Sequence, residues 1–314
     1  MLRQFPAVDQ GINQTCRWVD LVEPSAAEIA QVQQQFGIDV PSLEALQEIE
    51  ASSRLRVHGD VLYMSAPLLA GTSTDHWSVA PAGFILTPDI LVTVRFADLE
   101  AFDSVAAAIA TEESVLPASI FTCLMEEIVD RSADHLERAA EGINATSQAI
   151  FFDEPKRRQL SHDTATLRRA MRKIGQVSDR TSRVRYTFLS IGRMADFVME
   201  RCTPKLEEGI RDRLQAVRRD ISSLDEFELS LSGRVQLLQD AATGFISIEQ
   251  NDVVKVLTVV SVVGVPPVLV VGIYGMNFHY MPELSWKFGY PFAIFLCAVS
   301  IILPMMWFKW RDWI

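Results

Sequence analysis

A short polar stretch lies between two long apolar segments near the end of the chain. It contains Tyr274–Phe278 (Tyr-Gly-Met-Asn-Phe) and Met281–Leu284 (Met-Pro-Glu-Leu). The amide of Asn277 and the carboxylate of Glu283 supply oxygen atoms, which are the ligands that hard divalent cations prefer. An amide oxygen can accept hydrogen bonds from the water shell of such an ion, and a carboxylate raises the local cation concentration by its field. The stretch therefore presents a few polar side chains, compatible with cations as ligands, between two apolar segments.

The apolar segments on either side run from about Val253 to Ile273 and from about Tyr290 to Phe308. Each reaches the roughly 20 residues that a helix needs to cross the hydrocarbon core of a membrane. The sequence therefore predicts two transmembrane helices, the first ending at residue 273 and the second lying within residues 290–314, followed by a short tail.

The positions of the basic residues predict how these helices are oriented. Lys255 begins the first apolar segment, and Lys309 and Arg311 follow the second, whereas Glu283 and Lys287 cancel in the loop between them. Because positive charge favours the cytoplasmic side, both termini are expected in the cytoplasm and the loop 274–289 outside. Aromatic residues stand where an interfacial belt is expected: Trp286, Tyr290, Trp307, Trp310 and Trp313.

The rest of the chain is acidic. Residues 1–252 carry 25 Lys or Arg and 38 Asp or Glu, whereas residues 253–314 carry 4 and 2. An acidic body on a slightly basic anchor argues against a nucleic-acid partner and is compatible with cations as ligands. The first 30 residues contain no apolar run of signal-peptide length, so the N-terminus is expected to remain inside.

The residue pattern also argues against an enzyme. No nucleophile–base arrangement and no phosphate-binding glycine loop stands out in the sequence. The 4 cysteines and 5 histidines are scattered without metal-site spacing, which favours isolated reduced thiols in a cytosolic setting.

Residues 1–118 are predicted to form an acidic α/β domain. Turn residues that flank β-branched runs indicate strands and hairpins. The expected strands are Thr15–Val22, Arg54–Val57, Val61–Ala66, Gly83–Leu86 and Ile90–Phe96, the last of them covered on both faces; the expected helices are Ala26–Phe36 after the cap Ser25, Pro41–Ile49 and Asp103–Thr111.

The acidic residues of this domain leave two alternatives open. A charged surface is usually a solvated face. Alternatively, some of its carboxylates coordinate a divalent ion at a subunit boundary, with Asp98, Asp103, Glu112 and Glu113 as candidates. The sequence does not select among them.

Residues 119–202 are predicted to form a helical hairpin. Ser119–Phe152 is an acidic helix candidate, and Lys156–Arg193 is a basic one, with 11 Lys or Arg against Asp163 and Asp179. The turn Asp153-Glu154-Pro155 separates them. Complementary charge is expected to hold the two helices together in part. An anionic-lipid or nucleic-acid surface is the alternative, although the aromatic interleaving of single-strand binders is absent from the sequence.

Residues 203–273 are predicted to form one helix that begins at Thr203-Pro204 and continues into the membrane. Its length would be about 105 Å at 1.5 Å per residue. Glu228 interrupts an otherwise apolar heptad-like pattern, which demands a packed partner. The pattern consists of Ile210, Leu214, Val217, Ile221, Leu224, Leu231, Val235, Leu238 and Phe245.

One face of this helix collects the few polar and small residues of its membrane part. At 100° per residue they fall within roughly a third of the circumference. The residues on this face are Asp240, Asn251, Val254, Thr258, Ser261, Val265, Val268 and Gly272, with Leu257 at its edge. Such a face serves either ordinary helix packing or the lining of an aqueous path. Because two spans cannot enclose a path alone, the second alternative requires several copies.

These motifs resemble the CorA family of divalent-cation channels. The resemblance rests on Tyr274–Phe278, Met281–Leu284 and the spans that end in Lys309–Trp313, and it extends from Asn251–Thr258 to Trp286–Pro291. The upstream helices and the α/β domain agree with the family only in order and character. Gly-Met-Asn alone is a weak signal, since Gly and Asn commonly end helices, but its conjunction with the loop motif is specific.

The resemblance implies a funnel-shaped homopentamer in the cytoplasmic (inner) membrane, with a long stalk helix lining the pore and an outer ring of second spans. It implies Mg²⁺ uptake, often with Co²⁺ or Ni²⁺, and gating by intracellular Mg²⁺ bound between subunits. Self-association, membrane lipid and divalent cations are the expected partners. The resemblance assigns ion selection to Gly275, Met276 and Asn277, a polar pore position to Asn251, an acidic ring to Asp240 and a hydrophobic gate to Val254 and Leu257.

The chain departs from the family pattern at several positions. Val254 and Val268 stand where polar residues or Met are common, and His279 stands where an acidic residue is common. Only Lys309 and Arg311 remain of a usually more basic C-terminal cluster. Each difference could alter ion preference or rate.

Two other functions remain open at this point. The zinc-transporting branch of the superfamily usually varies the middle residue of the motif, so Met276 favours Mg²⁺, whereas His279 hints at Zn²⁺. A membrane-tethered sensor that binds ions without conducting them is the alternative from another class.

Overall fold

A computed structural model describes residues 1–5, 16–48, 50, 54–71, 77–110, 115–151, 160–276, 279, 281–311 and 313, leaving aside the side chains of 160–165, 283 and 284. The chain divides into two compact units. Residues 1–153 and 170–239 form the body unit, and residues 154–169 and 240–314 form the span unit. We describe each unit by itself.

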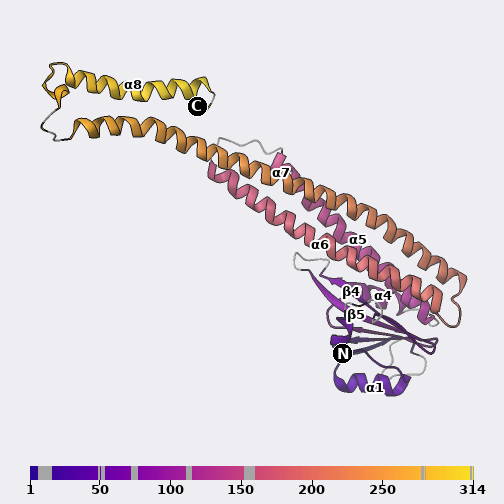
Figure 1. Cartoon of the computed structure of the whole chain (residues 1–314). Helices are drawn as coiled ribbons and strands as arrows, with labels where there is room; N and C mark the ends of the chain where they lie inside the picture. The colour runs from indigo at the N-terminus through magenta and orange to yellow at the C-terminus, as the bar shows by residue number, and fades with distance from the viewer. Residues whose placement is uncertain are drawn as a thin grey trace. The chain divides into compact units, whose positions relative to one another are not determined.

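The body unit begins with a 6-stranded sheet in the order β1-β2-β6-β5-β4-β3 (Figure 1). Neighbouring strands are antiparallel, except that β2 pairs parallel with β6. The strands are β1 (Leu2–Phe5), β2 (Trp18–Val22), β3 (Leu55–His58), β4 (Val61–Ala70), β5 (Ser78–Leu86) and β6 (Leu91–Arg95). Both predicted hairpins are confirmed, and β4 and β5 extend further than the sequence indicated.

Helices cover both faces of this sheet. On one face, α1 (Ala26–Phe36) and the short α2 (Leu43–Leu46) pack over β2, β5 and β6. On the other face lie α4 (Glu100–Ile109) and the start of α5. Every residue of β6 is buried, as predicted for a strand covered on both sides. The α/β character of the N-terminal region is therefore confirmed.

Local sequence accounts for the ends of α1. The Ser25 hydroxyl accepts from the Glu28 backbone N–H, while the Glu28 carboxylate accepts from the Ser25 N–H, so both donors of a capping box are satisfied. Gly37 ends the helix at φ 64°, a left-handed conformation that favours glycine. The prediction for this helix is confirmed at both ends.

Three long helices follow: α5 (Pro117–Phe151), α6 (Leu160–Arg201) and α7 (Glu208–Tyr274). Their buried apolar side chains join the core on the α4 side of the sheet. The predicted turn Asp153-Glu154-Pro155 lies outside the described residues. Complementary charge was expected between α5 and α6, but the interhelical ion pairs we describe join α7 to each of them. They are Arg213–Glu126 to α5, and Arg218–Asp196, Arg185–Asp225 and Arg185–Glu228 to α6.

The start of α7 differs from the prediction. Thr203 and Pro204 are joined by a cis peptide bond in the loop 202–207, and the helix begins at Glu208. The heptad pattern is buried from Ile210 to Leu238, with Leu224 partly buried, whereas Phe245 is 38% exposed. Glu228, the interruption, is buried in this seam. Its carboxylate accepts a hydrogen bond from Ser232 and pairs with Arg185 at 3.5 Å.

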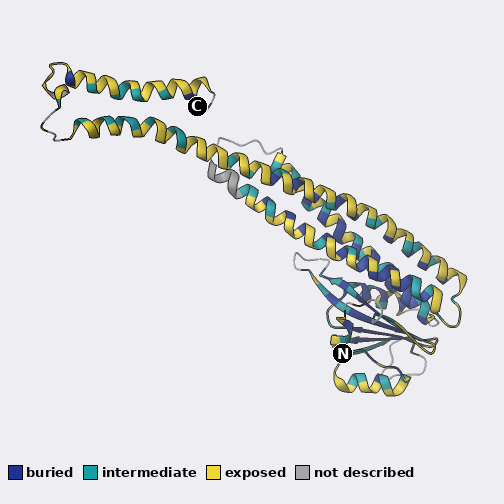
Figure 2. Cartoon of the chain, viewed as in Figure 1, coloured by how far each residue is buried: buried dark blue, intermediate teal, exposed yellow. Residues whose placement is uncertain are grey.

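The span unit contains α7 from Asp240 onward, the short 3₁₀ helix η1 (Pro282–Ser285) and α8 (Gly289–Trp310). By length and composition, α7 and α8 are candidate membrane spans, with hydropathies of 2.5 and 2.1 in their most apolar windows. Their apolar side chains are exposed (Figure 2), whereas those of a soluble core helix would be buried. Both predicted C-terminal spans are therefore helical in the structure, and their apolar surfaces are exposed.

One buried histidine lies in the bundle of the body unit. His135 on α5 is 1% exposed, and neither ring nitrogen has a hydrogen-bond partner. Burial, followed by the positive charges of Arg180 and Arg138, lowers its pKa from 6.5 to about 4, although Asp134 and Glu100 oppose the shift. The folded body unit therefore holds this imidazole in its neutral form.

This pKa predicts how stability depends on pH. Because the folded state binds the proton more weakly than the unfolded chain, stability is lost as the pH falls from about 6.5 to about 4. The variant His135→Leu should lose less stability on acidification and should gain on the order of 1 kcal/mol at pH 5. Thermal unfolding of the full chain in detergent, followed by circular dichroism at pH 5 and above pH 6.5, measures this change in stability. His58→Leu, at the exposed end of β3, is the control, and an equal effect of both variants would contradict the prediction.

Candidate functional site

The polar stretch that joins the two candidate spans begins at the C-terminal end of α7. The Gly275 N–H donates to the Val271 carbonyl at 2.9 Å, and the Met276 N–H donates to Ile273 at 3.2 Å. A Cβ at residue 275 would lie 3.1 Å from that carbonyl, so glycine allows the helix end to close tightly. Met276 is 45% exposed. Asn277 and the side chain of Glu283 lie outside the described residues.

One face of each candidate span is turned toward the other helix. On α8, the less exposed residues recur every three or four positions, as expected for one helix face. They are Ala293, Cys297, Ser300, Pro304 and Phe308. On α7, the corresponding set is Val259, Val263, Pro266, Val270 and Tyr274. The Cys297 thiol approaches the Pro267 carbonyl at 4.0 Å, which places these two faces against each other.

The polar face that the sequence predicted lies on the other side of α7. At 100° per residue, Val254, Ser261 and Val268 point roughly opposite to Val259 and Val270. Within the span unit this face is uncovered: Asp240, Asn251, Val254, Leu257, Ser261, Val265, Val268 and Gly272 are all exposed. Thr258 is partly buried, and its hydroxyl donates to the Val254 carbonyl at 2.8 Å within the same helix. The structure thus leaves the predicted residues on one open helix surface.

The candidate regulatory carboxylates occupy a different part of the molecule. Asp98 and Asp103 both approach the Arg95 guanidinium at 3.4 Å, and Asp103 also pairs with Arg3. The Asp98 side chain is 87% exposed. Glu112 and Glu113 lie outside the described residues. Among the residues that the structure describes, no group of three His, Cys, Asp or Glu side chains could hold a metal ion.

Sequence reasoning missed the buried network behind these two aspartates. The Arg95 side chain is fully buried, and it donates to the Asp20 carboxylate through Nε at 3.1 Å and Nη2 at 3.0 Å. The other Asp20 oxygen accepts from Thr93, which in turn accepts from the Trp18 indole. A charged residue in the otherwise apolar strand Leu91–Arg95 was the available signal, since a buried cation requires a partner.

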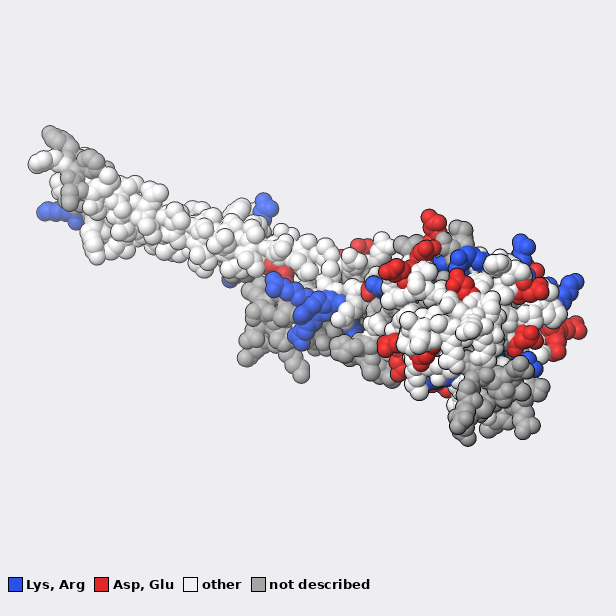
Figure 3. Space-filling model, turned by 90° about the horizontal axis from the view of Figure 1, so that it is seen from below, with Lys and Arg blue, Asp and Glu red and all other residues white. Residues whose placement is uncertain are grey.

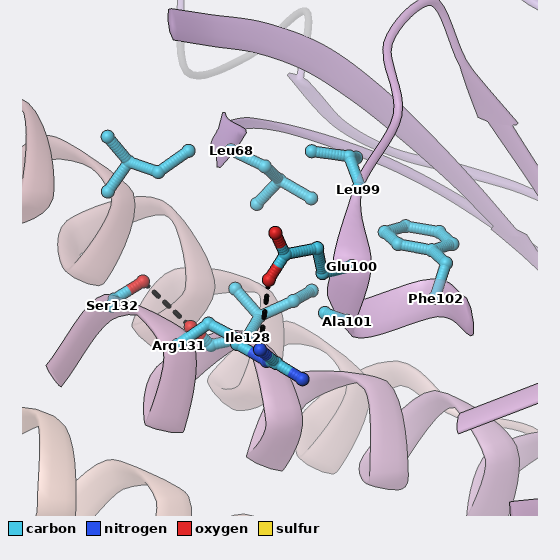
Figure 4. Close-up of a pocket in the computed structure, with 9 residues that line it drawn as sticks. Leu68, Leu99, Glu100, Ala101, Phe102, Ile128, Arg131 and Ser132 are labelled. Atoms are coloured by element: carbon cyan, nitrogen blue, oxygen red, sulfur yellow. Dashed lines mark hydrogen bonds and ion pairs between the residues drawn. The ribbon is translucent and has the colours of Figure 1, made fainter. Parts of the chain in front are cut away.

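Small cavities lie in the body unit. The one in Figure 4 has a volume of about 10 Å³, enough for one water molecule, and the Glu100–Arg131 ion pair at 2.9 Å lies at its edge. A second cavity of about 190 Å³ lies beside the loop 202–207, between largely apolar side chains.

Acidic side chains gather on the body unit (Figure 3). Partial burial, followed by the charges of Glu127, Asp220, Glu126 and Asp134, raises the pKa of Asp130 on α5. Glu126 and Glu127 are paired with Arg213 and Arg131. Burial is the larger cause of this raised pKa, and the neighbouring carboxylates add a negative potential that a proton or a cation would relieve.

An acidic α/β body followed by two exposed apolar helices, with a Gly-Met-Asn sequence between them, defines a membrane protein of the two-span type. Its fold matches the complete structure of the CorA magnesium transporter from Methanocaldococcus jannaschii, with a TM-score of 0.75 and 17% identity over 98% of this chain and 95% of that one.

Sequence comparison is more specific than the fold. Residues 13–310 match the model of the "CorA-like Mg2+ transporter protein" family. The chain is 31% identical to the magnesium transport protein CorA of Sodalis glossinidius over 100% of this chain and 96% of that protein. It is equally similar to that of Escherichia coli K12, over 95% and 92%. The chain therefore belongs to the CorA-like Mg²⁺ transporter family, as the resemblance predicted.

The acidic surface gives a testable prediction. Asp130→Asn removes one member of a repelling group, so it should stabilise the protein at neutral pH by a few tenths of a kcal/mol. Asp179→Asn is the matched control on α6. It loses the 3.0 Å pair with Arg183 and should be slightly destabilising. Thermal unfolding of both variants measures the difference, and a loss of stability in both would contradict the prediction.

Proposed function

We propose that this chain forms a channel that takes up Mg²⁺, together with Co²⁺ and Ni²⁺, across the cytoplasmic membrane. Five copies would assemble as a funnel-shaped homopentamer with both termini in the cytoplasm. The observation that carries the proposal is the uncovered face of α7, which holds Asn251, Ser261 and Gly272, with the partly buried Thr258 beside them, opposite the side packed against α8. Membership of the CorA-like family supports the choice of Mg²⁺ as the ion.

The assembly follows from what one copy lacks. Two spans cannot surround an aqueous path, and polar groups that face lipid are costly. Closed rotational symmetry is the usual way to turn one such face inward on every copy. In this arrangement α8 lies outside α7, because it packs on the face of α7 opposite the pore.

Ion selection is proposed at the ring of Gly275, Met276 and Asn277. Mg²⁺ gives up its water reluctantly, so a ring that recognises the hydrated ion avoids the cost of stripping it. Amide oxygens accept hydrogen bonds from the hydration shell, whereas a ring of carboxylates would hold the ion too tightly for release. Glu283 in the outer loop would concentrate cations at the mouth through its field.

Gating is proposed at the apolar section of the same face. Val254 and Leu257 follow Asn251 by one and two turns and would close the path by excluding water. Intracellular Mg²⁺ bound between subunits would favour the closed state, and dissociation of this Mg²⁺ would allow the channel to open. The regulatory carboxylates are unassigned, with Asp98, Asp103, Glu112 and Glu113 as candidates, and Asp240 is proposed as an acidic ring below the gate.

The selectivity proposal is tested by ion flux into liposomes that contain the purified full-length protein. Asn277→Ala should lower Mg²⁺ uptake about tenfold or more, because each copy loses hydrogen bonds to the hydrated ion. Ser285→Ala is the matched control. It lies in the same loop, and its hydroxyl donates to the Pro282 carbonyl at 2.8 Å within that loop.

The same assay separates the alternatives. Uptake of Zn²⁺ coupled to protons, without Mg²⁺ uptake, would show a zinc transporter. A protein that binds ions but passes none would be a sensor. Equal loss of flux in both variants would place the defect in the fold of the loop instead of in selectivity.

The gate is tested by two valines that differ only in the face they occupy. Val254 and Val256 are 60% and 57% exposed and lie about 160° apart around α7. Val254→Ser should raise Mg²⁺ flux several-fold at high internal Mg²⁺, because a hydroxyl favours water in the constriction. Val256→Ser should leave the flux near the wild-type value. A larger effect from Val256→Ser would place the pore on the wrong side of the helix.

A further inference from the structure

The face of α8 that is turned away from α7 is apolar and ends in a cation. Ile302 and Met306 project from it and are 55% and 68% exposed. Lys309 and Trp310 follow on the next turn, and Trp310 is 79% exposed. Ile302 and Met306 lie about 160° around the helix from Pro304, which belongs to the α7-facing side. This outward face therefore differs from the face that packs within the chain.

The end of α8 is held in one conformation by its own residues. The Trp313 N–H donates to the Phe308 carbonyl at 3.0 Å, and the Arg311 N–H donates to the Trp307 carbonyl at 3.1 Å. The Trp313 ring stacks on Phe308 with centroids 5.5 Å apart, a contact between residues five apart that commonly accompanies such a helix end. The Arg311 guanidinium lies 5.6 Å from the Trp307 ring centroid.

Lys309 differs in position from the other cations near the two candidate spans, whereas its lack of an ion pair among the described residues is shared by Lys287 and Arg311. It is the only charged residue within α8. Lys255 on α7 is neutralised by Asp252 at 3.1 Å, whereas no ion pair of Lys309 occurs among the residues that the structure describes. A lysine at the end of a span can extend its ammonium group to the headgroup layer while its methylene stem stays in the apolar region.

We propose that Lys309, Trp310, Met306 and Ile302 form a binding site for an anionic phospholipid. The ammonium group of Lys309 contacts the lipid phosphate, the indole of Trp310 lies at the headgroup boundary, and an acyl chain follows Met306 and Ile302. The site rests on the membrane topology of the proposed function, which places this end of α8 at the anionic cytoplasmic leaflet.

The chemistry favours a lipid over a second copy of the chain. A neighbouring protein would have to place a carboxylate opposite Lys309 at the membrane boundary. The bilayer itself supplies an anionic phosphate at that depth, with an apolar chain directly beside it. The order along the helix, with apolar residues followed by Trp and Lys, matches the order of chain and headgroup in a phospholipid.

The test uses full-length protein in detergent, titrated with phosphatidylglycerol or phosphatidylcholine, with bound lipids counted by native mass spectrometry. The wild-type protein should retain phosphatidylglycerol in preference. Lys309→Gln should weaken that binding about fivefold, and Lys309→Arg should restore it. Lys287→Gln, an exposed cation at the opposite end of α8, is the control and should have no effect.

Two results would overturn the site. Unchanged phosphatidylglycerol binding by Lys309→Gln would show that the lipid does not use this cation. A change of oligomeric state in that variant, without a change in lipid binding, would assign the face to another protein copy. Because lipid counting requires no transport, a protein that binds the lipid but carries no Mg²⁺ would refute only the proposed function.

Discussion

The apolar surface of α7 is the constraint on which the rest of the structure depends. Up to Leu238 the helix buries one apolar face against the core of the body unit. From Val253 onward its apolar side chains are exposed on nearly all sides, and α8 partly covers only one of them. Water cannot cover such a surface without a large free-energy cost, since burial of apolar area is worth roughly 25 cal/mol per Å². A single uninterrupted helix therefore packs against a protein core along one part of its length and requires an apolar environment along another.

Polar groups inside the body unit follow the complementary rule that a buried charge needs a partner. Arg95 and Asp20 meet this rule with two hydrogen bonds between parallel strands, and Thr93 completes the network. Glu228 meets it less fully, through Ser232 and a longer ion pair with Arg185. Such residues add little net stability compared with apolar side chains of the same size, but removing one partner leaves an unpaired charge. They connect particular elements, here β2 to β6 and α6 to α7.

The proposed ion path depends on what α8 leaves open. By packing against the Val259–Val270 side of α7, it leaves the half with Asn251 and Ser261 uncovered and Thr258 partly buried. Membership of a Mg²⁺ transporter family makes the uncovered half the candidate lining of an ion path. A chain with two spans can enclose such a path only together with other copies. The two sides of α8 divide in the same way, one facing α7 and the other meeting the bilayer.

The sequence by itself determined the features that rest on local chemistry and periodicity. Ser25 and Glu28 predicted the start of α1, the apolar runs predicted both candidate spans, and the Gly-Met-Asn motif indicated the family. Heptad spacing predicted which face of α7 would be buried. Only the tertiary structure decided that Arg95 pairs with Asp20, 75 residues away in the chain, and that α7 forms ion pairs with both α5 and α6. It also decided which face of α7 meets α8. These outcomes depend on which segments become neighbours after folding, and periodicity within one segment carries no information about its neighbours.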